Sequence, residues 1–368
     1  MTSNNPKPGA ARNDAGPQEK KTAAPRVSAL DYSEEQAAAS LGGTAKWFDL
    51  DGGRHVAELA LSGETFQGRL SLAPFPFLSK LVVNDTKLTA LDVSQNKALT
   101  VLDVSRNNLM LLDVSRNDAL AELDASGNRL DDLNVEKNLA LTKLNVSDNH
   151  LGDLRVAANA ALTRLDASKN RLRALDVREN AALTDLNVSG NKLRGLDVSF
   201  NRRLTTLDAS FNRLAALHVA ANGRLSRLYV GANHLSELNL AGNMVLERLD
   251  ASRNRLEALP TGRNKFLSRL NLSHNNITRQ DCDNNKFLVD LDLSGNGLVS
   301  LSVSQCVVLT ELDVSLNRLG ALDLGNNAAL RVLDVSNNCL ETLDLSRNTL
   351  LKEFDCGRNP LRKLAPPK

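Results

Sequence analysis

Hydrophobic and polar residues alternate along most of the chain in one frame that recurs every 21 residues. Each copy reads LxxLxVxxNxLxxLDVSxNxx, and its apolar positions 4 and 6, like positions 14 and 16, are separated by a single residue. This alternation predicts two short β-strands per copy, each with its apolar side chains on one side. The fourteen copies, whose first leucine we call position 1, begin at Leu78, Leu99, Leu120, Leu141, Leu162, Leu183, Leu204, Leu225, Leu246, Leu267, Leu288, Leu309, Leu330 and Leu351.

The repeat also carries an asparagine at positions 9 and 19, where we expect the chain to turn. One copy cannot bury its apolar residues alone, but stacked copies form a continuous core with backbone hydrogen bonds between rungs about 4.8 Å apart. At such turns an asparagine amide can donate to and accept from backbone groups that would otherwise lack a partner. Cys306 replaces one asparagine of position 19. As a weak polar substitute, it predicts a locally looser turn rather than a reactive site.

The segment before the regular copies has a different composition. Residues 1–28 are proline-rich and hold no aromatic residue, which predicts a disordered tail. The stretch SALDYSEEQAAASLGG then predicts a helix, and GTAKWFDLDGGRHVAELALSG predicts a β-hairpin around an Asp-Gly-Gly turn. The predicted organisation is a tail at 1–28, an N-terminal cap at 29–55 and a solenoid of about fifteen coils at 56–368.

The repeat pattern resembles a known family. LxxLxVxxNxL is the signature of leucine-rich repeats, and its union with LDVSxNxx in a 21-residue unit resembles the short bacterial repeats of internalin-like proteins. The resemblance covers residues 56–364, and WFDLDGGRHVAELALSGETFQGRLSLAPFPFL is similar to the N-terminal cap of plant-type leucine-rich repeat proteins. It implies a solenoid of mostly short parallel β-strands with an irregular convex side. It also implies a protein–protein interaction scaffold, without naming the partner.

Composition and motifs argue against several classes of function. The 45 lysines and arginines nearly balance the 43 acidic residues, and only 3% of residues are aromatic, which disfavours a protein driven onto nucleic acid. The chain shows no run of eighteen apolar residues and no apolar secretory signal. The four cysteines and five histidines are scattered, so we expect no metal or other cofactor. Because P-loop, G-x-S-x-G, H-E-x-x-H and dinucleotide motifs are absent, we expect no enzymatic activity.

Position 5 is aspartate in nine of the fourteen copies and asparagine in three. An acidic row suggests cation binding, yet a parallel aspartate recurs at position 15, in the other half of the coil. Its presence in both halves favours a role in the repeat itself. Carboxylates one rung apart repel by about 1 kcal/mol in water, which neighbouring cations or asparagines would relieve.

Recognition is expected where the copies differ and the side chain faces solvent, at positions 3, 5, 8 and 10. At position 3 three arginines, Arg227, Arg248 and Arg269, follow one another beside an acidic step. Position 10 forms a basic edge over seven coils, which comprises Arg129, His150, Arg171, Lys192, Arg213, His234 and Arg255. Two interpretations of this edge stay open, a solubilising surface or a site for an acidic partner.

Aromatic exceptions to the repeat coincide with the arginines. Tyr229 occupies position 5 and Phe211 occupies position 8 of the preceding coil. Aromatic residues and arginines together are favoured at binding hot spots, although Tyr229 and Phe211 could also simply cover one another by diagonal contact. The predicted partner-binding residues are Phe211, Arg227, Tyr229, His234, Arg248, Arg253 and Arg269.

The leading hypothesis is a non-enzymatic scaffold that binds a protein or peptide partner, with an acidic partner as one candidate, on its strand-lined face. One alternative is an exported bacterial effector that acts on a host protein, with residues 1–28 as a non-Sec export signal. Another is binding to the RNA backbone along the position 10 edge. We expect no small-molecule substrate and no membrane insertion, in a protein that is cytoplasmic or exported by a non-Sec route.

Overall fold

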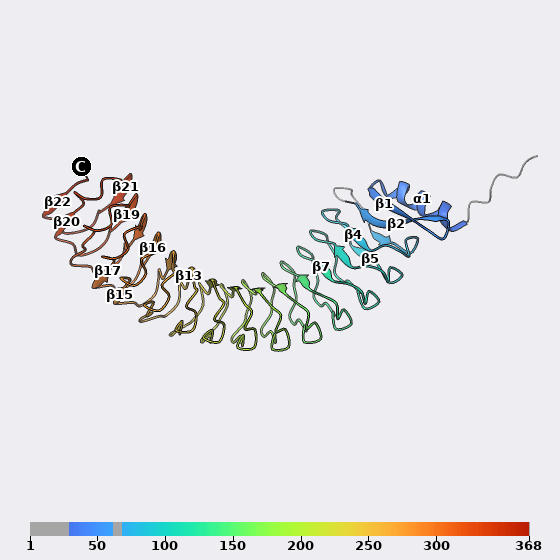
Figure 1. Ribbon diagram of the computed structural model, residues 1–368, viewed down its shortest axis with the longest axis horizontal. Coiled ribbons are helices and arrows are strands. Elements are labelled where there is room, and N and C mark those ends of the chain that lie inside the picture. The colour runs from blue at the N-terminus through green and yellow to red at the C-terminus, as the bar shows by residue number, and fades with distance from the viewer. Residues whose placement is uncertain (1–28, 62–67, 368) are drawn as a thin grey trace, which may run out of the picture.

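The computed structural model describes residues 29–61 and 68–367, so the predicted tail at 1–28 lies outside the described residues. The chain winds into one curved solenoid whose coils stack from the N-terminal cap to the C-terminus (Figure 1). The main sheet lines the inner, concave side of the arc, and the returning segments lie on the outer side. The predicted fold class, a repeat solenoid of short parallel strands, is confirmed.

Within the described residues the concave sheet has sixteen strands. β1 (Thr44–Leu50) and β2 (Gly53–Ala60) pair antiparallel as a hairpin, and β2 then pairs in parallel with β4 (Lys80–Val82). Every later strand covers positions 3 to 5 of its coil and pairs with the same positions of the next coil. These strands are β6 (Val101–Asp103), β7 (Glu122–Asp124), β8 (Lys143–Asn145), β9 (Arg164–Asp166), β10 (Asp185–Asn187), β11 (Thr206–Asp208), β12 (Arg227–Tyr229), β13 (Arg248–Asp250), β14 (Arg269–Asn271), β16 (Asp290–Asp292), β18 (Glu311–Asp313), β19 (Val332–Asp334) and β21 (Glu353–Asp355).

The outer side of the coils is less regular. Three short parallel pairs form there among the described residues, namely β3 (Arg69–Ser71) with β5 (Ala90–Asp92), β15 (Arg279–Asp281) with β17 (Ser300–Ser302), and β20 (Thr342–Asp344) with β22 (Lys363–Ala365). In the coils between β5 and β15 the corresponding segments make a single β-bridge, from Asp197 to His218. The convex side is therefore irregular, as the family resemblance implies, and the second strand predicted in each copy forms only in these few coils of the described residues.

The core consists of leucine ladders that run the length of the solenoid. Between Leu99 and Leu298 the residues at positions 1, 4 and 11 are at most 2% exposed. Positions 6 and 16 carry smaller residues such as Val104 and Ala125, which are equally buried. Full burial of one such leucine stabilises the fold by about 1.5–3 kcal/mol. Since a coil is covered only by its neighbours, this stabilisation depends on stacking.

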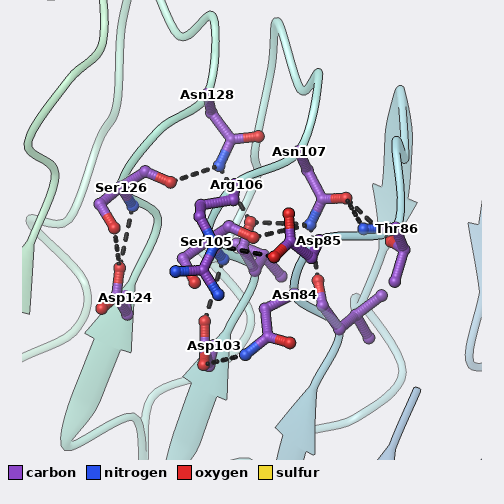
Figure 2. Close-up of polar contacts among 12 residues, drawn as sticks. Asn84, Asp85, Thr86, Asp103, Ser105, Arg106, Asn107, Asp124, Ser126 and Asn128 are labelled. Atoms are coloured by element: carbon purple, nitrogen blue, oxygen red, sulfur yellow. Dashed lines mark hydrogen bonds and ion pairs between the residues drawn. The ribbon is translucent and has the colours of Figure 1, made fainter. Parts of the chain in front are cut away.

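The asparagine at position 9 holds each inner turn. Asn128 Nδ2 donates to the carbonyl of Val104 in the previous coil at 2.9 Å, and to the carbonyls of Ala125 and Ser126 in its own coil at 3.1 and 3.2 Å. Its Oδ1 accepts the backbone N–H of Leu109 at 3.0 Å. Figure 2 shows this turn and its neighbour at Asn107. Both ends of the amide are engaged, as predicted.

The asparagine at position 19 holds the outer turn with only half of its amide. Asn180 Nδ2 donates to the carbonyls of Val156 and Asn159, both at 2.9 Å. Its buried Oδ1 has no hydrogen-bond partner in the described part of the chain, and the same is true of ten other asparagines in this row. The prediction that this row also accepts hydrogen bonds is wrong for these residues, because the turn presents carbonyls to the amide but no N–H group.

Cys306 occupies position 19, where only the donor group of the asparagine amide is used. Its Sγ lies 3.3 Å from the carbonyl of Cys282 and 3.6 Å from that of Asn285, the two groups that an asparagine would address. The turn keeps its backbone hydrogen bonds, from Cys306 N–H to Val303 at 2.9 Å and from Leu309 N–H to Cys306 at 3.1 Å. The predicted looser turn is therefore not found, since only a donor is required there. Burial raises the pKa of Cys306 to about 12, which fits an unreactive thiol.

The single described helix, α1 (Ala29–Leu41), packs beside β2 at the N-terminal end of the solenoid (Figure 1). The buried Glu34 accepts the backbone N–H of Val56 at 2.9 Å, and its second oxygen lies 3.1 Å from His55 Nδ1. Gly43 joins the helix to β1 where an added Cβ would lie 2.3 Å from the carbonyl of Ala60, so only glycine fits there. No helix among the described residues has the length and apolarity needed to cross a bilayer.

Candidate functional site

Positions 3 and 5 form the surface of the concave sheet, because positions 4 and 6 turn into the core. The strands pair without a register shift, so Arg227 lies beside Arg248, and Arg248 lies beside Arg269. Successive rungs are about 4.8 Å apart. Tyr229 follows Asp208 in the row of position 5. The structure therefore brings four of the seven predicted residues together, on β12, β13 and β14.

The aspartates at position 5 close the turn that follows each strand. Asp124 Oδ1 accepts the backbone N–H of Ser126 at 3.0 Å and its hydroxyl at 2.6 Å, as Figure 2 shows. The second oxygen of Asp124 accepts Nδ2 of Asn145 on the next rung at 3.0 Å. These contacts support the interpretation that the row belongs to the repeat itself. The described residues contain no group of three or more His, Cys, Asp or Glu side chains placed to hold a metal ion.

Four of the five charged residues of position 3 in the N-terminal half of the sheet are paired, and Lys80 is the exception among the described residues. Lys143 Nζ lies 2.6 Å from Glu122 on the preceding rung, and Arg164 lies 3.7 Å from Asp185 on the following one. The arginine stack differs. Arg227 donates to the hydroxyl of Thr206 at 3.0 and 3.1 Å. None of the three stacked arginines has a carboxylate within 4.0 Å in the part of the chain that the structure describes. Their charge is left for solvent or for a partner.

Tyr229 and Gly231 replace the usual aspartate of position 5 and the usual serine of position 7 in the same coil. In the preceding coil the serine of position 7 donates to the aspartate of position 5 at 2.6 Å. Tyr229 offers no carboxylate and Gly231 no hydroxyl, so this turn lacks the side-chain contact. A Cβ on Gly231 would lie 3.0 Å from Ser252 Oγ and 3.1 Å from Asp250 Oδ1. Gly231 thus leaves space beside Ser252 and Asp250 of the next rung, while Tyr229 lies on the concave surface.

Two depressions follow the concave face and meet at Tyr229. The larger, of about 860 Å³, runs from Lys80 to Tyr229 and is lined mainly by positions 3 to 5. The smaller, of about 320 Å³, runs from Tyr229 to Asp292 and includes Arg248 and Arg269. Tyr229 therefore lies between two grooves. The long one is lined by residues of both charges, and the lining of the short one changes from arginine to aspartate along its length.

The sheet becomes acidic directly after Arg269. Asp290 pairs in register with Arg269 on one side and with Glu311 on the other. Burial and the neighbouring Glu311 raise the pKa of Asp290, and the charge of Arg269 opposes them. Burial also raises the pKa of Asp313, to which Asp292 and a further aspartate contribute. The concave face thus carries a sharp change from positive to negative charge within two rungs.

The other predicted residues lie outside the sheet. Phe211 and Arg253 occupy position 8, where the backbone is left-handed, with φ of 54° and 51°. The same conformation recurs at position 8 of every regular coil, whatever the residue type. Sequence analysis missed it because aspartate, arginine, lysine and phenylalanine all occur there. Phe211 is 66% exposed, so Tyr229 does not cover it. His234 is exposed two residues beyond position 8, with Nδ1 3.0 Å from its neighbour's carbonyl.

An apolar row at position 21 was not predicted from the sequence. This position is alanine from Ala98 to Ala182, but Val245, Phe266, Phe287 and Val308 occupy it in four consecutive coils. All four are at least 41% exposed. The signal is present in the sequence, since position 21 is valine or phenylalanine instead of alanine in these four coils.

The comparisons with known proteins agree with this architecture. A family model described as leucine-rich repeat matches residues 137–154 and 263–280. A search of curated proteins gave no match.

Several solved structures are similar over most of the chain. The functional domain of InlJ from Listeria monocytogenes is 31% identical with a TM-score of 0.75, over 77% of this chain and 64% of that domain. A leucine-rich repeat protein of Leptospira interrogans is 26% identical with a TM-score of 0.73, over 82% of this chain and 85% of that one. YopM of Yersinia pestis, described as a leucine-rich effector protein, is 27% identical with a TM-score of 0.69, over 84% and 85%.

Proposed function

The chain is a leucine-rich repeat protein with internalin-like repeats, and we propose that it is a non-enzymatic scaffold that binds a protein or peptide partner on its concave sheet. The fold is typical of interaction scaffolds, and the specific site has to be argued from its residues. The proposed contact surface is centred on Arg227, Tyr229, Arg248 and Arg269. Phe211, Arg253 and His234 lie along its edge.

The observation that carries this proposal is the unpaired arginine stack beside Tyr229. Like charges on neighbouring strands destabilise a sheet, so a stack without carboxylate partners is a cost to folding. Elsewhere on the face this cost is relieved by pairs such as Lys143 with Glu122. Arginine and tyrosine are among the residues most enriched at binding hot spots, because each offers a large contact area and a polar group. An acidic partner would neutralise the stack.

The test is partner capture with two matched triple variants. The first, R227A/Y229A/R248A, removes positions 3 and 5 of one coil and position 3 of the next. The second, K143A/N145A/R164A, removes the same three positions in the N-terminal half of the sheet. We expect the first to lower capture of the partner from native cells at least about tenfold and the second to leave it unchanged. Thermal melting should change little for the first variant, because Arg227, Tyr229 and Arg248 face solvent and Tyr229 makes no turn contact. It should fall for the second, because Asn145 Oδ1 accepts the N–H and hydroxyl of Ser147, so unchanged capture by this less stable control is the more stringent result. Undiminished capture by the first variant would sink the proposed site.

A second candidate function is that of an exported effector. It is supported by the likeness to YopM, which spans 84% of this chain at 27% identity. Such a protein would use the same concave surface, so the two functions differ in where the partner is met. Fusion of residues 1–28 to a translocation reporter separates them. Reporter activity inside host cells would favour the effector, and its absence together with capture of a partner from the producing cell would favour the intracellular scaffold.

A further inference from the structure

A continuous apolar edge runs along one side of the concave sheet. It consists of Met244, Val245, Phe266, Phe287, Val307 and Val308, at positions 20 and 21 of four successive coils. Their exposed fractions range from 41% to 59%. The rings of Phe266 and Phe287 stack with centroids 6.1 Å apart and an angle of 10° between their planes. Single exposed apolar residues are ordinary, but a contiguous row marks a surface that excludes water with a partner.

Cations surround this apolar edge. Lys265 and Lys286 directly precede the two phenylalanines in the chain and are exposed. Arg248 and Arg269 begin the strands that follow Val245 and Phe266 by three residues. None of these four cations has a carboxylate within 4.0 Å among the described residues. The acidic side chains close by are Glu247, Asp290 and Glu311, and the last two begin the strands that follow Phe287 and Val308. The four cations therefore outnumber the three carboxylates, and the positive charge is concentrated beside Val245 and Phe266.

We propose that the apolar edge is a second docking surface and that it takes an acidic amphipathic peptide segment, with large apolar side chains flanked by aspartate or glutamate. The apolar side chains would cover Phe266 and Phe287, and the carboxylates would pair with the lysines and arginines on either side. The edge is continuous with the arginine stack, so a single partner can reach both surfaces. This inference rests on the proposed binding function and adds the class of partner and its place.

The size of the edge sets the length of the peptide. Three rung intervals separate Val245 from Val308, which is about 15 Å at 4.8 Å per rung. An α-helix covers this distance with about ten residues and an extended strand with about five. A segment of about fifteen residues is therefore long enough to span the edge in either conformation.

The experiment uses the full chain and displayed random peptides of about fifteen residues as the probe. Peptides enriched on the native protein are synthesised, and their affinities are measured for the native chain and three variants. F266S/F287S removes the stacked pair. F200S removes a phenylalanine whose exposed fraction, 57%, matches those of Phe266 and Phe287, 55% and 57%. R227A/Y229A/R248A removes the concave site.

Enriched sequences that combine aspartate or glutamate with large apolar residues are expected. Their affinity should fall at least about tenfold in F266S/F287S and stay unchanged in F200S. Peptides that lose affinity only in R227A/Y229A/R248A would overturn the apolar edge as a docking surface and leave the concave function standing. Enriched peptides that are basic, or that bind F266S/F287S normally, would overturn the assigned partner. Enrichment of no peptide at all would count against both surfaces.

Discussion

Two stretches of five coils, residues 99–203 and residues 204–308, share one backbone and differ in their side chains. We call them the regular and the variable segment. In the regular segment position 14 is always leucine, position 16 always valine and position 19 always asparagine. In the variable segment Thr261 and Cys282 stand at position 16, Gln280 at position 14 and Cys306 at position 19. The surface departures, Tyr229 and the phenylalanines of the apolar edge, fall in the same segment.

The strand register is the same in both segments, which shows that it does not depend on a uniform core. In the variable segment the polar core residues satisfy one another. Gln280 Nε2 lies 3.3 Å from the carbonyl of Leu259 and 3.4 Å from Thr261 Oγ1, and the Thr261 hydroxyl donates to Asn285 Oδ1 at 2.8 Å. The hydrogen bonds between the coils therefore tolerate substitutions in the core and on the surface. One segment can thus carry different surface side chains without a change of fold.

The largest expected effect concerns the thiols, which test whether the variable segment is packed as tightly as the regular one. Cys282 and Cys306 are buried, whereas Cys339 is exposed. Burial raises the pKa of Cys306 to about 12. At about pH 8 it therefore holds almost no thiolate, and labelling requires local opening. We expect Cys339 to react with a thiol reagent at least about a thousandfold faster than Cys306 in the native protein. Mass spectrometry of digested samples measures this ratio. Comparable rates would mean that the variable segment opens readily.

The next largest effect is expected when cysteine, which replaces an asparagine at Cys306 of the variable segment, is placed at an asparagine of the regular segment. In the coil that begins at Leu162, Asn170 at position 9 both donates and accepts, whereas Asn180 at position 19 only donates. N170C should cost about 2–3 kcal/mol, because the N–H of Leu151 loses its acceptor. N180C should cost less than about 1 kcal/mol, because a thiol can replace the donor. Denaturant unfolding of both variants decides the point. Equal losses would refute this explanation of Cys306.

The smallest effect is expected from a substitution that gives the core of the variable segment the leucine found in the regular segment. Gln280 is 7% exposed, and its amide contacts are long, at 3.3 to 3.4 Å. Q280L replaces it by the leucine that the regular segment carries at position 14. We expect a gain of about 1 kcal/mol, since apolar burial outweighs weak hydrogen bonds. A rise in melting temperature would show this, with L175Q in the regular segment as the opposite change. A loss of stability in Q280L would mean that the polar network is a required part of these coils.

The period and apolar pattern of the sequence are enough to predict the stacked coils, the hairpin around Asp51 and Gly52, and the inner asparagine ladder. The pattern could not predict that the asparagines of position 19 donate hydrogen bonds without accepting any, because this depends on which backbone groups face the turn. The left-handed position 8 was hidden by its variety of residue types. At the candidate site, the stacking of Arg227, Arg248 and Arg269 follows directly from the period. The lack of carboxylate partners for them depends on side-chain reach, which pattern alone does not give.

Site-specific photo-crosslinking tests most directly whether the variable segment of the concave sheet contacts the partner. A benzophenone amino acid is placed at Tyr229, at Asn145 on the same face of the regular segment, or at Asn239 on the outer side, and each chain is irradiated with its captured partner. A covalent adduct is expected at Tyr229 and little or none at the other two positions. Equal adducts at Asn145, or an adduct confined to Asn239, would contradict a contact through the variable segment.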